Sequence, residues 1–139
     1  MAELDPDLVQ AYRDAVYEIH ADTIIRLKVS EYSHSLVKLH KKHNCSTSAL
    51  ITACNPRSQI LSDAENAVRM TALTAEIEAL GYAYLPAMAK DPQGRWPDEA
   101  GLWIAGLTKN EAEHIARSFE QNALLWATKD AIPQLVLLT

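Results

Sequence analysis

The residues best able to do chemistry gather around the start of one long predicted helix. Positions 55–69 include the candidate ligand-binding side chains Asn55, Arg57, Ser58, Ser62, Asn66 and Arg69. A helix start presents unpaired backbone N–H groups at the positive end of the helix dipole. An arginine fork adds a group that matches a carboxylate or phosphate. This combination predicts a site for a small anionic or nucleotide-like ligand at the helix start.

Helical spacing places Asn66 on the side of this helix that should be buried. At about 100° per residue, Asn66 falls on one stripe with Met70, Leu73 and Ile77. A buried unpaired amide costs about 1–3 kcal/mol, so Asn66 must have partners. Two interpretations stay open: Asn66 fixes the connection before the helix, or it contacts a ligand.

A second candidate feature is the loop between two predicted strands, residues 89–101. It contains Asp91, Gly94, Arg95 and Trp96. A tryptophan in such a loop anchors a partner or covers a ligand, or else it folds back and pins the loop to the core.

Two amides, Gln121 and Asn122, stand directly before a predicted strand. They either satisfy carbonyl groups at a helix end or face the same pocket as Asn66. We include both in the predicted ligand site.

Metal and thiol chemistry have weaker support in the sequence. His40 and His43 share a helix face, and Cys45 is nearby, but a fourth ligand is not evident. Cys54 follows a predicted strand and precedes a helix start, which favours either an activated thiol or a small buried apolar residue. The sequence therefore predicts neither a metal site nor a cofactor.

Catalysis is a third possibility for the polar helix start. Ser58, Ser62, Asp63 or Glu65 could take part, with Arg69 stabilising charge. A nucleophile needs a base within hydrogen-bonding reach, and no histidine is near these positions in the sequence. We therefore name no catalytic residue.

Composition and charge narrow the class of protein. The chain has 139 residues, 48% hydrophobic and 22% charged, which fits one folded domain over 1–139. The net charge of −5 disfavours nucleic acid as a partner. The acidic N-terminus lacks the basic and apolar pattern of a signal peptide, and no apolar stretch approaches about 20 residues. These features predict a cytoplasmic protein without a membrane span.

Hydrophobic periodicity and turn residues predict the element order α-β-β-α-β-α-β-β-α-β-β. Helix starts are expected at four caps: Asp5, Ser33, Ser62 and Thr108. Strands are expected over 16–21, 23–29, 50–54, 82–88, 102–107, 123–128 and 134–138. Hairpins combined with helical crossovers predict an α+β fold, with a mixed β-sheet of about six strands and helices packed on it.

These segments together resemble a family of small bacterial proteins, the domain of unknown function family 3293. The resemblance rests on motifs along nearly the whole chain: Leu8-x-x-Ala11-Tyr12-Arg13, Ile51 to Ser58, Leu61-Ser62-x-x-Glu65-Asn66-x-x-Arg69, Asp91-Pro92-x-Gly94-x-Trp96-Pro97, Gly106-Leu107 and Phe119-x-Gln121-Asn122-Ala123. Two positions depart from the family pattern. Met70 stands where an asparagine commonly follows the arginine, and Glu120 where a glycine commonly precedes the glutamine, which argues against a tight helix end there.

The resemblance implies a bacterial cytoplasmic protein but supplies no reaction. It also implies that the polar helix start, the tryptophan loop and the Gln121-Asn122 step belong to one recurring set. The leading hypothesis is a binding protein without catalysis that holds a small anionic or nucleotide-like molecule. The alternative is a protein-interaction or regulatory module that acts through the Trp96 loop, and an enzyme is the third option.

Overall fold

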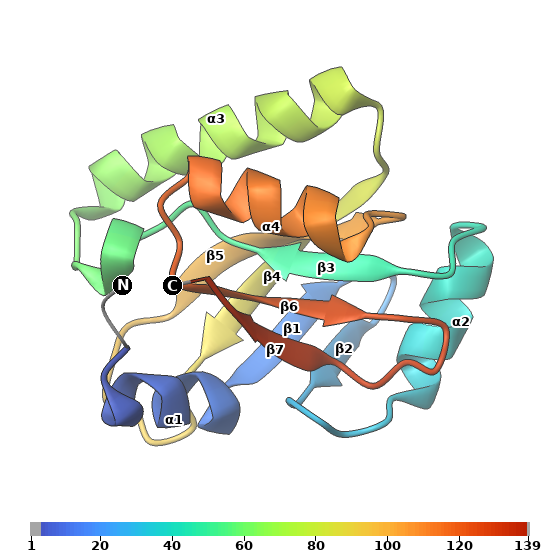
Figure 1. Cartoon of the computed structure of the whole chain (residues 1–139), viewed down its shortest axis with the longest axis horizontal. Helices are drawn as coiled ribbons and strands as arrows, with labels where there is room; N and C mark the ends of the chain where they lie inside the picture. Colours follow the sequence, from blue (N-terminus) through green and yellow to red (C-terminus); the bar gives the residue numbers. More distant parts are fainter. Residues whose placement is uncertain (1–3, 139) are drawn as a thin grey trace.

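The computed structural model describes residues 4–138 and joins seven strands into one sheet (Figure 1). The strands are β1 (Val16–His20), β2 (Ile24–Leu27), β3 (Ser48–Ile51), β4 (Tyr84–Lys90), β5 (Glu99–Ala105), β6 (Ala123–Ala127) and β7 (Gln134–Leu137). Their order across the sheet is β2-β1-β4-β5-β3-β6-β7.

The described residues form four α-helices, one before β1 and three between strands, and each begins at the cap that the sequence predicts. They are α1 (Pro6–Asp14), α2 (His34–Lys42), α3 (Asp63–Leu80) and α4 (Lys109–Ser118), and the short turn η1 (Pro56–Ser58) precedes α3. The side chains of Asp5, Ser33, Ser62 and Thr108 each accept a hydrogen bond from a backbone N–H of the first turn. Gly81 ends α3 in the left-handed conformation, with φ of 84°. None of these helices is long and apolar enough to span a membrane.

The α+β class and the element order are confirmed, but every strand pair is antiparallel, so the sheet is not mixed. The antiparallel pairing follows from where two helical crossovers place the strands that they join. Helix α3 carries the chain from β3 to β4, and β5 lies between these two strands; α4 carries it from β5 to β6, and β3 lies between them. Strands joined by a crossover therefore never become neighbours. The unit from β3 to β6 has the βαββαβ order of a ferredoxin-like fold.

The two faces of the sheet are covered by different helices. Helices α3 and α4 lie on one face, above the sheet in Figure 1, and pack Leu73, Ile77 and Ile115 on the apolar side chains of that face. Helix α2 packs on the opposite face, where Leu36 and Leu39 join a cluster around Trp103. Helix α1 lies on this second face as well, away from α3 and α4, and closes one end of it (Figure 1).

One end of each of two strands differs from the prediction, and the difference affects the site. Strand β4 continues to Lys90, and β5 begins at Glu99, three residues before the predicted start. The loop between them is therefore shorter than 89–101. Antiparallel pairing of Ala89 with Glu99 accounts for this extension, because the partner strand decides where a strand begins.

The end of α4 is tight even though Glu120 replaces the expected glycine. The N–H groups of Glu120 and Gln121 bond to the carbonyl groups of Arg117 and Ala116, which is the Schellman arrangement. This helix end requires Glu120 to adopt the left-handed backbone conformation, with φ of 60°.

Glu120→Gly should therefore stabilise the protein by about 0.5–1 kcal/mol. A left-handed conformation costs a residue with a side chain about 1–2 kcal/mol. The carboxylate of Glu120 contributes less, since it lies 3.7 Å from Arg57 and 3.6 Å from Arg69 at a half-exposed position. Urea denaturation measures the change. Glu120→Ala is the matched control: it removes the same carboxylate and keeps the strain, so a gain in stability from alanine as well would contradict this explanation.

Candidate functional site

A cavity of about 200 Å³ lies between α1 and the face of the sheet opposite α3 and α4. The sheet residues beneath it are small: Ala87 and Ala89 on β4, and Gly101 on β5. Gly101 must lack a side chain, because a Cβ atom there would lie 2.9 Å from the carbonyl oxygen of Ile51. Larger side chains surround this hollow, so the alternation of small and large residues on neighbouring strands creates the cavity.

Glu99 is the acidic group of this pocket. It lies on the same face of β5 as Gly101 and Trp103, opposite Ala89 on β4, and Tyr17 on β1 is one strand further on. Its Oε2 atom accepts a hydrogen bond of 2.9 Å from the side-chain amide of Asn55. Burial raises the pKa of the Glu99 carboxyl, and the Asn55 bond lowers it by less. A carboxyl group in an apolar pocket is a common feature of binding and catalytic sites.

Asn55 is held in place by the residue that the sequence singled out on α3. The side-chain oxygen of Asn66 accepts from the backbone N–H of Asn55, and the Asn66 amide donates to the side-chain oxygen of Asn55, both at 2.9 Å. That oxygen also accepts from the N–H of Leu61. Asn55 is buried and left-handed, with φ of 48°. Asn66 therefore binds the connection, and through Asn55 it orients Glu99.

A hydroxyl cluster joins α1 to the same connection. The hydroxyl groups of Tyr12 and Ser58 are 2.7 Å apart, and the amide of Asn122 donates to the Ser58 oxygen at 2.9 Å. Ser58 can reach both because its backbone is left-handed, with φ of 61°. The Tyr17 hydroxyl donates to the backbone oxygen of Tyr12, and burial raises the pKa of both tyrosines. Neither partner of Ser58 is a base at neutral pH, so this serine is not an activated nucleophile.

The loop between β4 and β5 turns Trp96 toward the pocket. The buried carboxylate of Asp91 accepts bonds from the backbone N–H groups of Gln93 and Arg95 and from the Arg95 guanidinium. These contacts lower the pKa of Asp91 to about 2. Gly94 has φ of 67°, which suits the turn. Trp96 lines the pocket, and its indole N–H is buried without an acceptor among residues 4–138.

Two other predicted site residues bind backbone carbonyl groups instead of facing the pocket with free donors. The Arg69 guanidinium donates to the oxygen atoms of Ala53 and Phe119. The Gln121 amide donates to the oxygen atoms of Cys54 and Phe119, and Gln121 also borders the pocket. Together they tie the end of β3 to the end of α4.

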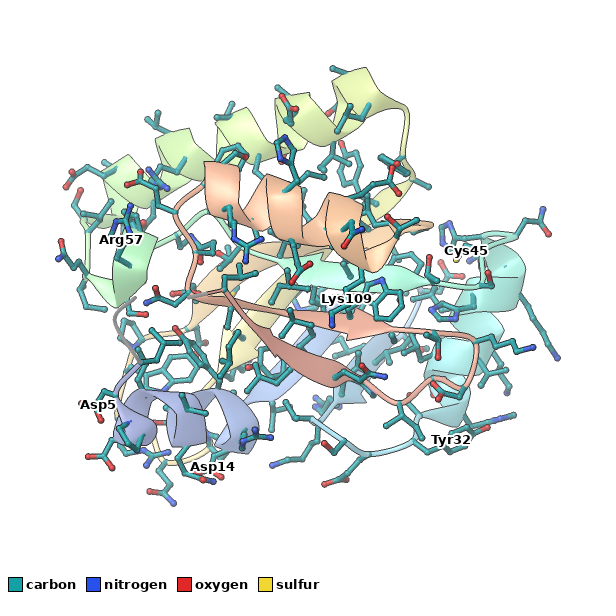
Figure 2. The ribbon with its side chains drawn as sticks, in the orientation of Figure 1. Asp5, Asp14, Tyr32, Cys45, Arg57 and Lys109 are labelled. Carbon is teal, nitrogen blue, oxygen red and sulfur yellow. The ribbon has the colours of Figure 1, made fainter. Side chains whose placement is uncertain are left out.

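The start of α3 is occupied by its own side chains. Ser62 and Glu65 form a capping box, in which Ser62 accepts from the N–H of Glu65 and the Glu65 carboxylate accepts from the N–H of Ser62. Arg57 points outward on the turn before α3, with 70% of its side chain exposed (Figure 2). Of the residues that the sequence grouped at this helix start, only Asn55 and Ser58 line the pocket, together with Gln121 from the segment after α4.

The candidates for metal and thiol chemistry, His40, His43 and Cys54, have structural roles. The ring nitrogen Nε2 of His40 bonds to the Ser48 hydroxyl at 2.7 Å, and both His40 and His43 pack on Trp103. No group of three or more His, Cys, Asp or Glu side chains within residues 4–138 is arranged to hold a metal ion. Burial raises the pKa of the Cys54 thiol, which is the behaviour of a buried apolar residue and not of an activated nucleophile.

Glu99→Gln should stabilise the protein by about 0.5–2 kcal/mol at pH 7, because it removes a partly buried negative charge. Single stabilising substitutions commonly have an effect of this size. The folded protein binds the Glu99 proton more tightly than the unfolded chain does, because the folded pKa is raised. Stability therefore falls as pH rises from the unfolded pKa of about 4.3 toward the higher folded pKa. Glutamine stays neutral and keeps an oxygen for the Asn55 amide, so its advantage should vanish near pH 3. Urea denaturation at both pH values tests this, with the exposed Glu76→Gln as control; an equal gain at pH 3 would contradict it.

Sequence reasoning missed Glu99, Tyr12 and Tyr17 as site residues. The signal for Glu99 was present, since a strand starting there puts it on one face with Gly101 and Trp103. Tyr12 joins the site because α1 folds across the sheet, and Tyr17 because β1 pairs with β4; no local pattern indicates either.

Fold and site together define an α+β protein with a ferredoxin-like core and a partly apolar pocket under its first helix. The chain belongs to the family described as Protein of unknown function (DUF3293), whose sequence model matches residues 51–124, just over half of the chain. The matched part includes Asn55, Asn66, Arg69, Trp96, Glu99 and Gln121. No curated protein and no solved structure matches the chain.

Proposed function

We propose that this protein binds a small, mainly apolar molecule in the pocket between α1 and the sheet. The cavity itself carries the proposal. Its volume of about 200 Å³ exceeds the roughly 150 Å³ of an engineered protein cavity that takes up benzene. Natural cores are packed at high density, so a hollow of this size beside polar groups is a typical ligand site.

Two polar groups in the pocket support a ligand with polar as well as apolar parts. The buried Trp96 N–H has no acceptor among the described residues, and leaving such a donor unpaired costs about 1–3 kcal/mol. Glu99 uses only its Oε2 atom in a hydrogen bond with residues 4–138 and leaves Oε1 for another partner. A bound molecule that offers an acceptor to the Trp96 N–H and a donor or a positive charge to Glu99 would satisfy both groups.

Helix α1 supplies a route for the ligand. None of its nine residues, Pro6–Asp14, is fully buried, although Tyr12 and Leu8 line the pocket. Few polar contacts hold it: the Tyr12 hydroxyl meets Ser58, the backbone oxygens of Tyr12 and Asp14 accept from Tyr17 and Lys28, and the Asp14 carboxylate lies near Arg95. An element held this lightly can open on the time scale of ligand binding.

This proposal keeps the binding function that the sequence favours and changes the position and charge of the ligand. An anion at the start of α3 would compete with the capping box of Ser62 and Glu65. In the pocket it would meet the Glu99 carboxylate instead of the Arg69 fork, which is bound to carbonyl groups. The alternative of a protein partner on the Trp96 loop has less support, because Trp96 is turned toward the pocket and not outward.

A fragment screen by ligand-observed NMR tests the proposal. We expect hits with one aromatic ring for the wild-type protein, and their loss in Ala87→Leu, which fills the floor of the pocket from β4. Ala67→Leu adds the same side chain to the exposed side of α3 and should keep the hits. Hits that survive in Ala87→Leu, or a screen without hits, would contradict a ligand site in this pocket.

A further inference from the structure

We infer that the pocket selects an organic ammonium cation, with the Glu99 carboxylate as its counter-ion and the rings of Tyr12, Tyr17 and Trp96 around it. This inference rests on the proposed binding function and names the class of ligand. It follows from charge, from the aromatic residues and from the shortage of hydrogen-bond acceptors in the site.

The charge of the pocket favours a cation. Glu99 is the single charged side chain among the described residues that line it. No lysine, arginine or histidine borders the cavity within residues 4–138 to neutralise this carboxylate. The chain as a whole carries a net charge of −5, so the long-range field also attracts cations. A cationic ligand would provide the partner that a desolvated carboxylate needs.

Three aromatic residues from three different segments line the same cavity. Tyr12 comes from α1, Tyr17 from β1, and Trp96 from the loop between β4 and β5. The hydroxyl groups of both tyrosines are already engaged, with Ser58 and with the Tyr12 backbone oxygen. What these tyrosines offer a ligand is therefore their rings. Aromatic rings attract a cation through the negative charge of the ring face, and the effect grows when water is excluded.

The number of acceptors decides which kind of cation fits. A primary ammonium group has three N–H donors, and burying any of them without an acceptor costs binding free energy. Among the described lining residues, the Thr52 oxygen already accepts from the N–H of Cys54, the Asn55 oxygen from Leu61 and Asn66, and the Ser58 oxygen from Asn122. Glu99 Oε1 and the side-chain oxygen of Gln121 are the carboxylate and amide oxygens of the lining that accept no hydrogen bond within residues 4–138, fewer than the three acceptors that a primary ammonium group needs. An alkylated ammonium group, which has few or no N–H donors, suits this environment, and an oxygen elsewhere in the ligand would accept from the Trp96 N–H.

Three matched probes separate the charge from the shape of the ligand. Benzyltrimethylammonium is the cation, neopentylbenzene is its uncharged isostere, and 3-phenylpropionate is an anion of similar size. Dissociation constants are measured at pH 8 by two-dimensional NMR titration of the full chain, including the indole N–H signal of Trp96. We expect the cation to bind at least about tenfold more tightly than the isostere, and the anion most weakly.

Variants assign the preference to named groups. Glu99→Gln should reduce the affinity for the cation about tenfold and leave that for the isostere unchanged. Trp96→Leu should weaken cation binding severalfold, and Trp96→Phe, which keeps a ring, should weaken it less. Equal or tighter binding of the isostere, with no effect of Glu99→Gln, would overturn this inference and leave the proposed pocket standing. Binding of none of the three probes, with no fragment hits, would overturn both.

Discussion

Asn55→Ala should lower the free energy of unfolding by about 3–5 kcal/mol. The substitution removes the acceptor of two donors, the Leu61 N–H and the Asn66 amide, and each unpaired buried group costs about 1–3 kcal/mol. Alanine must also adopt the left-handed conformation at φ of 48°, which asparagine tolerates better. The Glu99 carboxylate would lose its amide donor as well.

The matched control for this prediction is Asn44→Ala. Asn44 is also left-handed, with φ of 50°, but it is exposed and its side chain forms no hydrogen bond with residues 4–138. Its loss should cost about 1 kcal/mol, the conformational part alone. Urea denaturation of both variants gives the difference. Similar losses at the two positions would show that the hydrogen bonds around Asn55 contribute nothing.

Arg69→Met should lower the free energy of unfolding by about 2–4 kcal/mol. The guanidinium donates to the carbonyl groups of Ala53 and Phe119, which belong to the ends of β3 and α4. Hydrogen bonds from a charged donor are worth about 1.5–3 kcal/mol each, and methionine keeps much of the apolar stem. The loss should also expose the backbone amides of Ala53 and Phe119 to faster hydrogen exchange.

Arg117→Met provides the comparison for Arg69. Arg117 is exposed on α4, and its side chain forms no hydrogen bond or ion pair with the described residues. Its replacement should change stability by less than about 0.5 kcal/mol. If Arg69→Met is as mild as Arg117→Met, the guanidinium would be free for a ligand, and the sequence prediction of an anion-binding fork would regain support.

The elements of this fold could be predicted because each has a local signal. Caps at Ser62 and Thr108, each with a glutamate three residues later, mark the two helices of the ferredoxin-like unit. Gly81 marks the end of α3. Strand direction could not be predicted in the same way, because it depends on which strand lies between the two strands that a crossover joins. No residue of α3 or α4 indicates that β5 and β3 fill those places.

Only the part of the site around Asn66 could be predicted from the sequence. The sequence indicated that Asn66 must have partners, and the structure provides them in Asn55. Glu99 is 44 positions further along the chain and meets Asn55 only through the pairing of β3 with β5. Tyr12 reaches Ser58 across 46 positions. Contacts of this range depend on the tertiary fold, so the pocket could not be inferred from the spacing of its residues.

A map of NMR chemical-shift changes tests the central claim, a ligand site under α1, most directly. It is recorded on the full chain at saturation with the tightest-binding fragment or ammonium probe. We expect the largest changes on the amides of Tyr12, Tyr17, Ala89 and Glu99 and on the Trp96 indole N–H, which all belong to the pocket. Changes centred on Ser62, Asp63 and Arg69 at the start of α3, with the Trp96 signal unmoved, would contradict it.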